Sequence, residues 1–566
     1  MRERGDGELE AEDASPSGRR DRRRLLLISV CVAVPSIVAA VRVIRADWVP
    51  IGDQAIISIR AADVLTGRTP RLGQLSTVSA EVGETTRSPG PMGYWPFAVT
   101  ARWGPLWGTV VVAAALSASA MVASVRLAAR RGGVGLALAL ALGLALSSRA
   151  LNPGGLVSTW NPALGLIPLV LLVLLAWSLG MGELRLLPVA VLVASFCAQV
   201  HTVLAVAALP VLAIGLVAGL LATARADRPA GLRHRLRLPP GSARPLLGAV
   251  VVGVVCWALP VLDEITSDPG NLTLLARGAP GEPSTWSLVG RLLADVLGVP
   301  PAFVGGDVLP DEQVESVFFR PAPTTAALTS VAVIGALAVL GLRAARRRER
   351  EVVVPVLLVL ALVGAGAAVA RATPGRLFLT LTYTAWWLVL VGMLAWLVLG
   401  WAAVRAVDVV ALRPGARSGR GGALVTAVGC VAIVAIAVLG PSEAEPDLPI
   451  HAEARAVGDA VVRAVDAGGR YYVVGHGRAP SELVAATAYR IRRAGARPVV
   501  AGNDGFSPGP RYFPKGKRCT AVVTLSSPSS GMPRGSEVIA RIDVPTRDGP
   551  SAVRVTVGPD DGPPSC

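Results

Sequence analysis

The stretch that decides the fold class is residues 25–44, LLLISVCVAVPSIVAAVRVI, an apolar run that directly follows the arginine cluster within residues 19–24. About 20 apolar residues form a helix long enough to cross the roughly 30 Å hydrocarbon core of a bilayer. No small-residue cleavage site follows, so we interpret the run as an uncleaved first span. Because arginines are retained on the cytoplasmic side, the tail of residues 1–24 is predicted to be cytoplasmic.

Further apolar runs of similar length follow along the chain. Hydrophobic residues make up 52% of the sequence and charged residues only 17%, whereas a soluble chain of this size would need a more charged surface. Residues 186–222 fit either two short spans or one long span with a re-entrant piece. The fold class predicted for residues 25–440 is an α-helical polytopic membrane protein with about eleven transmembrane helices, at 25–45, 106–125, 134–150, 162–180, 186–202, 204–222, 246–262, 323–342, 352–371, 377–400 and 423–440.

The charge pattern gives the orientation. The net charge is +16, and nearly all of it is arginine. With eleven spans, the first loop at 46–105, the loop at 263–322 and the tail from 441 fall outside the plasma membrane. The sequence lacks a basic stripe with interleaved aromatics, which excludes nucleic acid as a partner and leaves the lipid bilayer. The arginine-rich segments that this model places in the cytoplasm are 126–131, 225–244, 343–350 and 405–420.

The tail, residues 441–566, differs from the rest of the chain. Two helix-like segments, His451 to Ala467 and Ser481 to Ala494, alternate with short β-branched runs. That order predicts a small extracytoplasmic α/β domain. Six cysteines are too few and too scattered for a disulfide scaffold or a zinc site, and whether Cys519 and Cys566 pair is left open.

The first outer loop holds the best candidate for chemistry. The segment Trp48 to Gln54 follows the first span and leads into a helix-like stretch, residues 55–65, whose apolar and polar residues alternate at helical spacing. Asp53 is therefore predicted to lie just above the membrane. Its carboxylate is a candidate general base for a hydroxyl, and a cap for the helix that follows is an equally good interpretation.

Other polar and aromatic residues gather at the same predicted membrane surface. Singly, each has a structural explanation, such as a packed histidine, a snorkelling arginine or the aromatic belt. Together they suit one reaction, in which the acid takes a proton from an acceptor hydroxyl while histidine and arginine stabilise a lipid-borne phosphate leaving group. We predict donor-phosphate contacts from His201, Arg371 and Arg376, and substrate contacts from Gln54, Trp160, Asp263, Glu264 and Tyr383.

Several short motifs give the chain a family resemblance over about residues 25–440. They are Trp48 to Gln54, Pro70-Arg71-Leu72-Gly73, Ser88-Pro89-Gly90-Pro91, Gln199-Val200-His201 and the passage from Trp257 to Asn271. With these motifs, the chain resembles the GT-C superfamily of polyprenyl-phosphate-sugar-dependent glycosyltransferases, particularly the actinobacterial membrane proteins.

This resemblance implies a GT-C fold and inverting transfer of a sugar from a polyprenyl-phosphate donor to a cell-envelope glycan or lipid acceptor. Asp53 takes the place of the catalytic acid in the first loop. Some relatives hold a divalent cation, Mg or Mn, with a paired-acid motif. Here the acids of the first loop, Asp53 and Asp63 among them, are isolated rather than paired, so no metal ligand is assigned, and Ser88 stands where similar chains have histidine.

Two other classes of function stay open. A transporter or flippase would place polar residues near the bilayer midplane and show inverted repeats, whereas here the polar residues lie at outer ends and no repeat is found. A non-catalytic envelope scaffold would bind a partner through the outer C-terminal domain. The sequence has no Walker loop, HExxH, CxxC or Ser-His-Asp elbow, which argues against ATP-driven transport and against hydrolysis by those routes.

Overall fold

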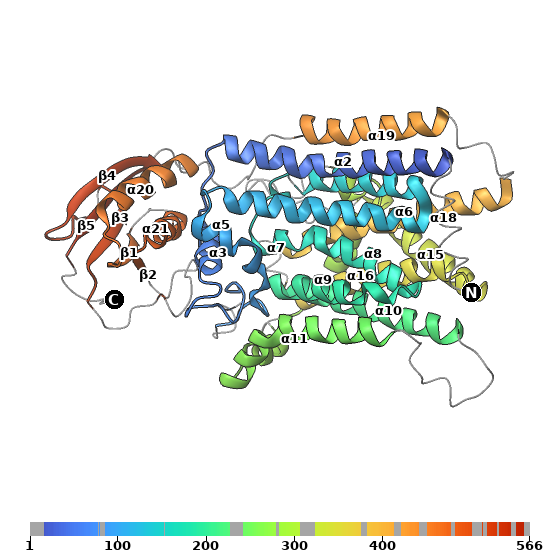
Figure 1. Ribbon diagram of the computed structural model, residues 1–566, viewed down its shortest axis with the longest axis horizontal. Helices are drawn as coiled ribbons and strands as arrows, with labels where there is room; N and C mark the ends of the chain where they lie inside the picture. Colours follow the sequence, from blue (N-terminus) through green and yellow to red (C-terminus); the bar gives the residue numbers. More distant parts are fainter. Residues whose placement is uncertain are drawn as a thin grey trace.

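The computed structural model consists of a helical bundle with an α/β domain at one end (Figure 1). The first long helix, α2 (Pro16–Arg45), runs from the far end of the bundle to the end that meets this domain. The residues that the structure describes are 16–76, 79, 85–151, 153–226, 242–278, 282–305, 323–374, 382–411, 420–440, 450–476, 481–500, 512, 518–528, 531–544 and 551–559.

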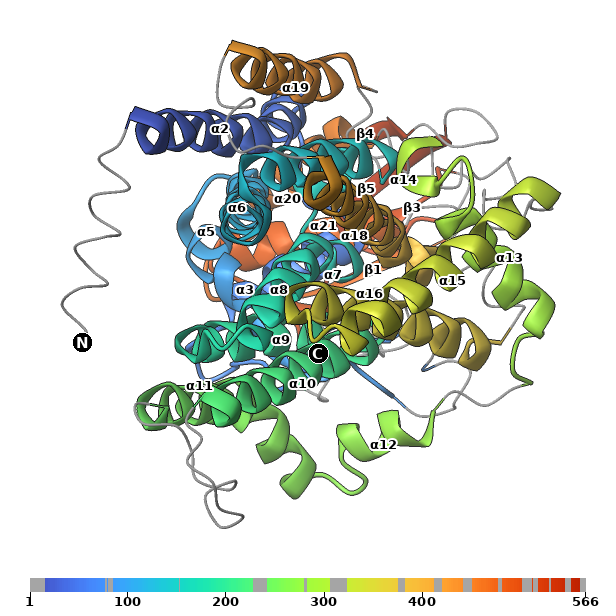
Figure 2. The ribbon, with the colours of Figure 1, turned by 90° about the vertical axis from the view of Figure 1, so that its right-hand side faces the viewer.

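Within these residues, nine helices are long and apolar enough to cross a membrane. A shorter apolar helix, α9 (Leu187–Val200), packs among them. Figure 2 shows the bundle nearly end-on, with α2 and α19 side by side on one flank. The long helices after α2 are α6 (Gly108–Ala150), α8 (Leu166–Gly180) with the single turn α7 (Asn161–Leu164) before it, α10 (Thr202–Ala226), α11 (Ala243–Thr266), α15 (Thr324–Arg346), α16 (Arg350–Ala372), α18 (Trp386–Ala411) and α19 (Arg420–Leu439).

The segment named α6 is a hairpin of two helices. Its backbone leaves the helical region at Gly132 (φ −139°, ψ 21°) and Gly133 (φ 70°, ψ −169°), and the positive φ of Gly133 suits glycine. The Ser117 hydroxyl donates to the Leu156 carbonyl oxygen at 2.8 Å, across 39 residues that would extend about 58 Å as one straight helix. The chain therefore reverses at the two glycines, and the limbs match the predicted runs 106–125 and 134–150.

The ambiguous stretch 186–222 forms two helices. α9 ends at Val200, His201 is extended (φ −154°, ψ 132°), and α10 begins at Thr202. With the two limbs of α6 and with α9, helices account for most of the described part of each of the eleven predicted apolar runs. The apolar prediction is thus confirmed at the level of helices, and the number that cross the bilayer remains a prediction.

Arginines gather at the end of the bundle away from the α/β domain. The turn after residues 126–131 and the turn that joins α15 to α16 both lie at that end, because the opposite ends of these helices approach the domain. Arg131 pairs there with Glu183, and Arg405 pairs with Glu351. This grouping agrees with the predicted charge asymmetry, while the side of the membrane that it faces stays a prediction.

The long loops carry short helices. The first loop contains α3 (Gly52–Ala62), two 3₁₀ turns, η1 (Pro91–Gly93) and η2 (Trp95–Phe97), and α5 (Ala98–Trp103). The loop at 263–322 contains α12 (Asn271–Arg277), α13 (Trp286–Leu297) and α14 (Ala302–Gly305) in its described part. α13 packs against α15, α16 and α18, so this loop folds back onto the bundle.

The C-terminal domain has a five-stranded mixed sheet in the order β2-β1-β3-β5-β4. β1 is parallel to β2 and to β3, whereas β5 is antiparallel to β3 and to β4. This confirms the predicted small α/β domain. Its elements are α20 (His451–Ala464), β1 (Arg470–His476), α21 (Ser481–Arg493), β2 (Arg497–Val500), β3 (Ala521–Ser526), β4 (Glu537–Val544) and β5 (Ser551–Gly558).

The cysteines divide between the two parts of the molecule. Cys31, Cys197, Cys256 and Cys430 are buried free thiols of the bundle, as their apolar surroundings predict. Cys519, beside β3, is disulfide-bonded. Cys566, whose pairing with Cys519 the sequence left open, lies outside the described residues.

Candidate active site

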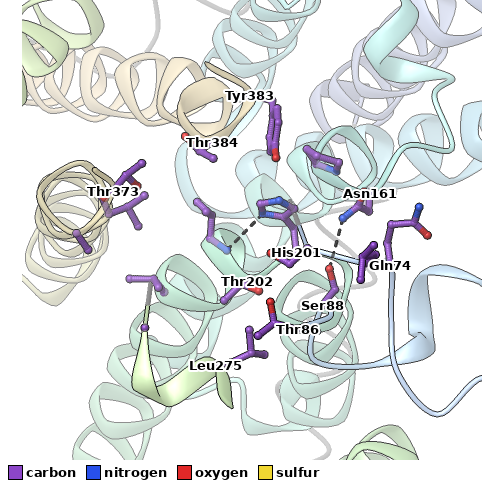
Figure 3. A pocket seen from close by; sticks show the side chains of 18 of the residues that line it. Gln74, Thr86, Ser88, Asn161, His201, Thr202, Leu275, Thr373, Tyr383 and Thr384 are labelled. Atoms are coloured by element: carbon purple, nitrogen blue, oxygen red, sulfur yellow. Dashed lines mark hydrogen bonds between the residues drawn. The ribbon is translucent and has the colours of Figure 1, made fainter. Parts of the chain in front are cut away.

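A cavity of about 390 Å³ lies at the end of the bundle that meets the C-terminal domain. The ends of many elements surround it, which explains why its residues are dispersed along the chain. Its polar wall includes Asp53, Gln74, Thr86, Ser88, Asn161 and His201, several of which Figure 3 shows side by side. Its apolar wall includes Val203 and Val206 of α10, Leu274 and Leu275 of α12, and Ala368 and Val369 of α16.

Asp53 is held at this cavity by two N–H donors. The side-chain amide of Gln74 donates to Oδ1 at 2.9 Å, and the indole Nε1 of Trp160 donates to Oδ2 at 3.0 Å. The N-cap of α3 is Ile51, so Asp53 is not the capping residue. It lies in the first turn of α3, where the helix dipole favours a negative charge. Both donors and the dipole stabilise the ionised carboxylate.

A buried tyrosine orients the Gln74 amide. The Tyr94 hydroxyl donates to Gln74 Oε1 at 3.4 Å, which leaves the amide nitrogen of Gln74 directed at Asp53. Burial raises the pKa of Tyr94, although the nearby Arg60 and Arg87 act in the opposite direction. The hydroxyl therefore keeps its proton, and a chain of hydrogen bonds runs from Tyr94 through Gln74 to Asp53.

His201 lies at the break between α9 and α10. The backbone N–H of Val203 donates to His201 Nδ1 at 3.3 Å, so Nδ1 is an acceptor and the ring proton is on Nε2. The imidazole contacts Tyr383 edge-to-face with the ring centroids 5.7 Å apart, and Tyr383 in turn contacts Trp160 at 4.9 Å. Figure 3 shows His201 and Tyr383 close together at the cavity. This places a neutral N–H donor and two large aromatic rings on its lining.

Hydrogen bonds fix the cavity wall to the surrounding loops. Asn161 donates to the Val200 carbonyl at 3.1 Å and to the Ser88 hydroxyl at 3.4 Å (Figure 3). Asn271, at the start of α12, accepts from the Arg87 N–H at 2.9 Å and donates to the Arg87 carbonyl at 3.0 Å. The first loop is therefore tied to α7, α9 and α12.

The structure brings together four of the predicted site residues, Asp53, Trp160, His201 and Tyr383. Arg371 instead lies over the Trp286 ring at 5.6 Å and lines a neighbouring hollow, which shares Ala368 and Ala372 with the main cavity. Arg376 lies outside the described residues.

Three other predicted residues are absent from the described cavity lining. Gln54 is buried on α3, and Asp263 lies near the end of α11. Glu264 has a structural role, because its carboxylate accepts the backbone N–H of Leu272 at 2.8 Å and also binds Thr273. It therefore caps α12.

The sequence prediction missed Gln74, Thr86 and Asn161 as cavity residues. Two of them adjoin motifs that had been noted, since Gln74 follows Pro70 to Gly73 and Asn161 follows Trp160. An amide has no titratable group to attract attention. The sequence signal that could have identified Gln74 and Asn161 as cavity residues was their position directly after these motifs.

The described residues do not fit a divalent cation. No group of three or more His, Cys, Asp or Glu side chains is found among them. Both Asp53 oxygens face N–H donors, which suit an anion and would repel a metal ion. We therefore derive no step through a metal.

Comparison with known proteins gives only distant likenesses. No family model matches the chain, and no curated protein matches it. The chain is similar to two crystal structures of ArnT from Cupriavidus metallidurans, one bound to undecaprenyl phosphate and the other in the apo state. Their sequence identities are 14% and 13%, with a TM-score of 0.48 in both cases, and each match covers 93% of this chain and 97% of ArnT.

Proposed function

We propose that the protein is a membrane glycosyltransferase that moves a sugar from a polyprenyl-phosphate donor to a hydroxyl of a cell-envelope glycan or lipid. In this proposal the reaction takes place on the outer face of the membrane, with Asp53 as general base. The observation that carries it is the position of the Asp53 carboxylate at a cavity that is lined by both polar and aliphatic side chains.

The two walls match the two parts of such a donor. A lipid-linked sugar phosphate has a polar head and a long apolar chain, and the cavity lining offers amides, hydroxyls and an imidazole as well as aliphatic side chains. The apolar lining includes side chains of α12 and side chains at the start of α10 and the end of α16, two helices that are long and apolar enough to cross a membrane, so the cavity lies at the level of these two helix ends. A site at this level suits a substrate that stays in the bilayer.

The proposed step is a direct displacement. Asp53 takes the proton of the acceptor hydroxyl while the acceptor oxygen forms a bond to the anomeric carbon of the sugar. The bond between that carbon and the phosphate oxygen breaks, and its electron pair leaves with the polyprenyl phosphate. One displacement inverts the anomeric carbon. Gln74 and Trp160 hold the carboxylate in place before it accepts the proton.

Donor contacts come from the other cavity residues in this proposal. The Nε2–H of His201 is a hydrogen-bond donor for the phosphate, whose negative charge grows as the bond breaks. Tyr383 and Trp160 form an aromatic surface for a sugar ring or for the first prenyl units. Arg371 and Arg376 remain proposed phosphate contacts, and Gln54, Asp263 and Glu264 remain proposed substrate residues.

The test is transfer of radiolabelled sugar from synthetic polyprenyl-phosphate donors in membranes that contain the protein. Asp53→Asn keeps the size of the side chain and removes the base, so transfer is expected to fall by about a hundredfold or more. Asp459→Asn is the matched control, because Asp459 pairs with Arg490 inside the C-terminal domain, and it should transfer at the wild-type rate.

Each outcome has a defined meaning. Transfer by wild type and by Asp459→Asn, but not by Asp53→Asn, supports both the reaction and the base. Transfer at an equal rate by all three would refute Asp53 as the base, and Asp263→Asn would be tested next. No transfer by wild type from any donor in a panel of different sugars would refute the proposed reaction.

A further inference from the structure

The helix that carries Asp53 is shared between the membrane bundle and the C-terminal domain. On one face of α3, Ile57, Ala61 and Ala62 belong to the hydrophobic core of the bundle. On the other face, Ala55, Ile56 and Ile59 belong to a second core. The second core also contains Val473, Leu483, Tyr489, Val523 and Val555 of the C-terminal domain.

α3 therefore completes the core of a domain whose own elements begin some 400 residues later in the chain. Apolar burial is the main stabilising term for such packing. The 11 residues of α3 are almost entirely buried, which is unusual for a loop helix. Without the domain, the apolar face of α3 that carries Ala55, Ile56 and Ile59 would be exposed.

A buried ionic contact joins the two parts at the end of α3. Asp63, its C-cap residue, is fully buried, and its carboxylate accepts hydrogen bonds from Arg492 at 3.2 Å and from the Tyr512 hydroxyl at 2.5 Å. Both donors belong to the C-terminal domain. Burial raises the pKa of Tyr512 and the charge of Asp63 raises it further, so the hydroxyl remains a donor. Arg68 lies over the Tyr512 ring at 5.7 Å.

Because the charge of Asp63 is buried, this contact is stable only with its hydrogen-bond partners in place. A carboxylate removed from water is stable only while its partners stay in place, and loss of one partner leaves an uncompensated buried charge. The partners of Asp63, Arg492 of α21 and Tyr512, belong to the C-terminal domain and not to the bundle. The position of α3 is thereby linked to the position of the domain.

Further contacts between the two parts flank α3. Before it, His451 binds the Val49 carbonyl at 2.9 Å. Beside it, the Tyr489 hydroxyl donates to the Ala101 carbonyl of α5 at 3.0 Å. The domain thus contacts the segment before α3, the helix itself and the helix that packs against it.

We propose that the C-terminal domain positions the Asp53 carboxylate by holding α3, with Asp63, Arg492 and Tyr512 as positioning residues. This inference rests on the proposed function of Asp53. Asp53 and Asp63 lie at opposite ends of one helix, about 15 Å apart along its axis, so a shift at Asp63 moves Asp53 with it. A displacement of about 1 Å at a reacting group is enough to slow an enzyme about a hundredfold.

The experiment compares Tyr512→Phe and Asp63→Asn with Asp459→Asn in the full-length protein. Tyr512→Phe keeps the ring and removes only one donor to Asp63. It therefore serves as the milder variant, which should still fold if Asp63→Asn does not. Asp459→Asn removes an ion pair between α20 and α21 without a contact to α3. Two properties are measured, hydrogen exchange of the peptide covering 52–62 and the turnover and donor KM of sugar transfer.

We expect exchange of α3 to become about tenfold faster or more in Tyr512→Phe and Asp63→Asn, while exchange of α8 stays unchanged. Turnover should fall about tenfold or more, with donor KM within about twofold of wild type. Asp459→Asn should match wild type in both properties.

Unchanged exchange of α3, or faster exchange with wild-type turnover, would overturn the positioning role. If the wild-type protein transfers no sugar, the proposed function fails. Hydrogen exchange then still decides whether the domain holds α3. The two failures are therefore distinguishable.

Discussion

Replacing Gln199 with methionine is expected to destabilise the protein, and a proline in a neighbouring helix explains why. Pro260 lies inside α11 and has no N–H, so the carbonyl of Cys256, four residues earlier, lacks its helical donor. The side-chain amide of Gln199 supplies the missing donor at 2.8 Å and is fully buried. The structure thus predicts that the cost of losing Gln199 depends on Pro260.

The size of the destabilisation follows from the Cys256 carbonyl, which Gln199→Met leaves without a hydrogen-bond donor. A buried carbonyl without a partner costs about 1–3 kcal/mol, while hydrogen bonds between helices in membrane proteins average about 0.6 kcal/mol and reach about 1.7 kcal/mol. Because methionine has a similar length and leaves no large cavity, we expect Gln199→Met to lower the free energy of unfolding by about 1.5 kcal/mol. In Pro260→Ala the alanine N–H restores the helical bond to Cys256. In the Pro260→Ala background, Gln199→Met should therefore lower the free energy of unfolding by only about 0.5 kcal/mol or less.

The assay is a double-mutant cycle on the protein in dodecyl maltoside, unfolded by increasing sodium dodecyl sulfate. The four proteins are wild type, Gln199→Met, Pro260→Ala and the double variant. A coupling energy of about 1 kcal/mol between the two positions is the expected result. Equal costs of Gln199→Met in the two backgrounds would show that the amide does not serve the carbonyl released by Pro260, and the reasoning would be refuted.

Three further predictions concern other contacts. Trp160→Phe removes the donor to Asp53 at 3.0 Å but keeps an aromatic ring, so turnover should fall about tenfold in the sugar-transfer assay, and a wild-type rate would contradict the assigned bond. Gly90→Ala places a methyl group 2.1 Å from the Gln199 carboxamide oxygen, and thermal unfolding should show a loss of about 1–3 kcal/mol. Burial lowers the pKa of His451, so protonation favours the unfolded state, and stability should fall as the pH drops below about 6.5. Thermal unfolding at pH 7.5 and 5.5 checks this, and His451→Gln should lose that part of the pH dependence.

The apolar helices could be predicted from the sequence because the signal is local. A run of apolar residues long enough for a span is visible without any knowledge of its neighbours, and glycines mark the reversal at Gly132 and Gly133. The ambiguity at 186–222 arose because the break at His201 has no proline or glycine. The backbone of His201 is extended, but the apolar pattern continues on both sides of it, so the composition did not show where α9 ends and α10 begins.

The candidate site could be predicted only in part. Asp53, Trp160, His201 and Tyr383 were found because charged or aromatic residues are conspicuous at the ends of apolar runs. The partners that orient them were missed, since an amide such as Gln74 acquires its role only through a tyrosine 20 residues away. Glu264 has a structural contact that the sequence did not indicate, because its carboxylate accepts the backbone N–H of Leu272 at the start of α12.

Three of the quoted motifs, those that contain Gly90, Gln199 and Pro260, are explained by contacts with one another. Gly90 lets the first loop approach Gln199, and Gln199 reaches the carbonyl that Pro260 leaves free. These contacts tie the loop to α9 and α11 on the bundle side, whereas Asp63 ties α3 to the C-terminal domain. The segment around Asp53 is therefore attached both to the bundle and to the C-terminal domain.

Asp53 is thus fixed from two directions, and the two attachments should fail differently. Weakening the bundle side, as in Gly90→Ala, moves the wall that carries Ser88 and should therefore raise donor KM as well as lower turnover. Weakening the domain side, as in Tyr512→Phe, leaves that wall in place and should affect turnover alone. If both variants changed donor KM equally, the cavity wall and α3 would have to move as one body, and the separate role of the C-terminal domain would lose its basis.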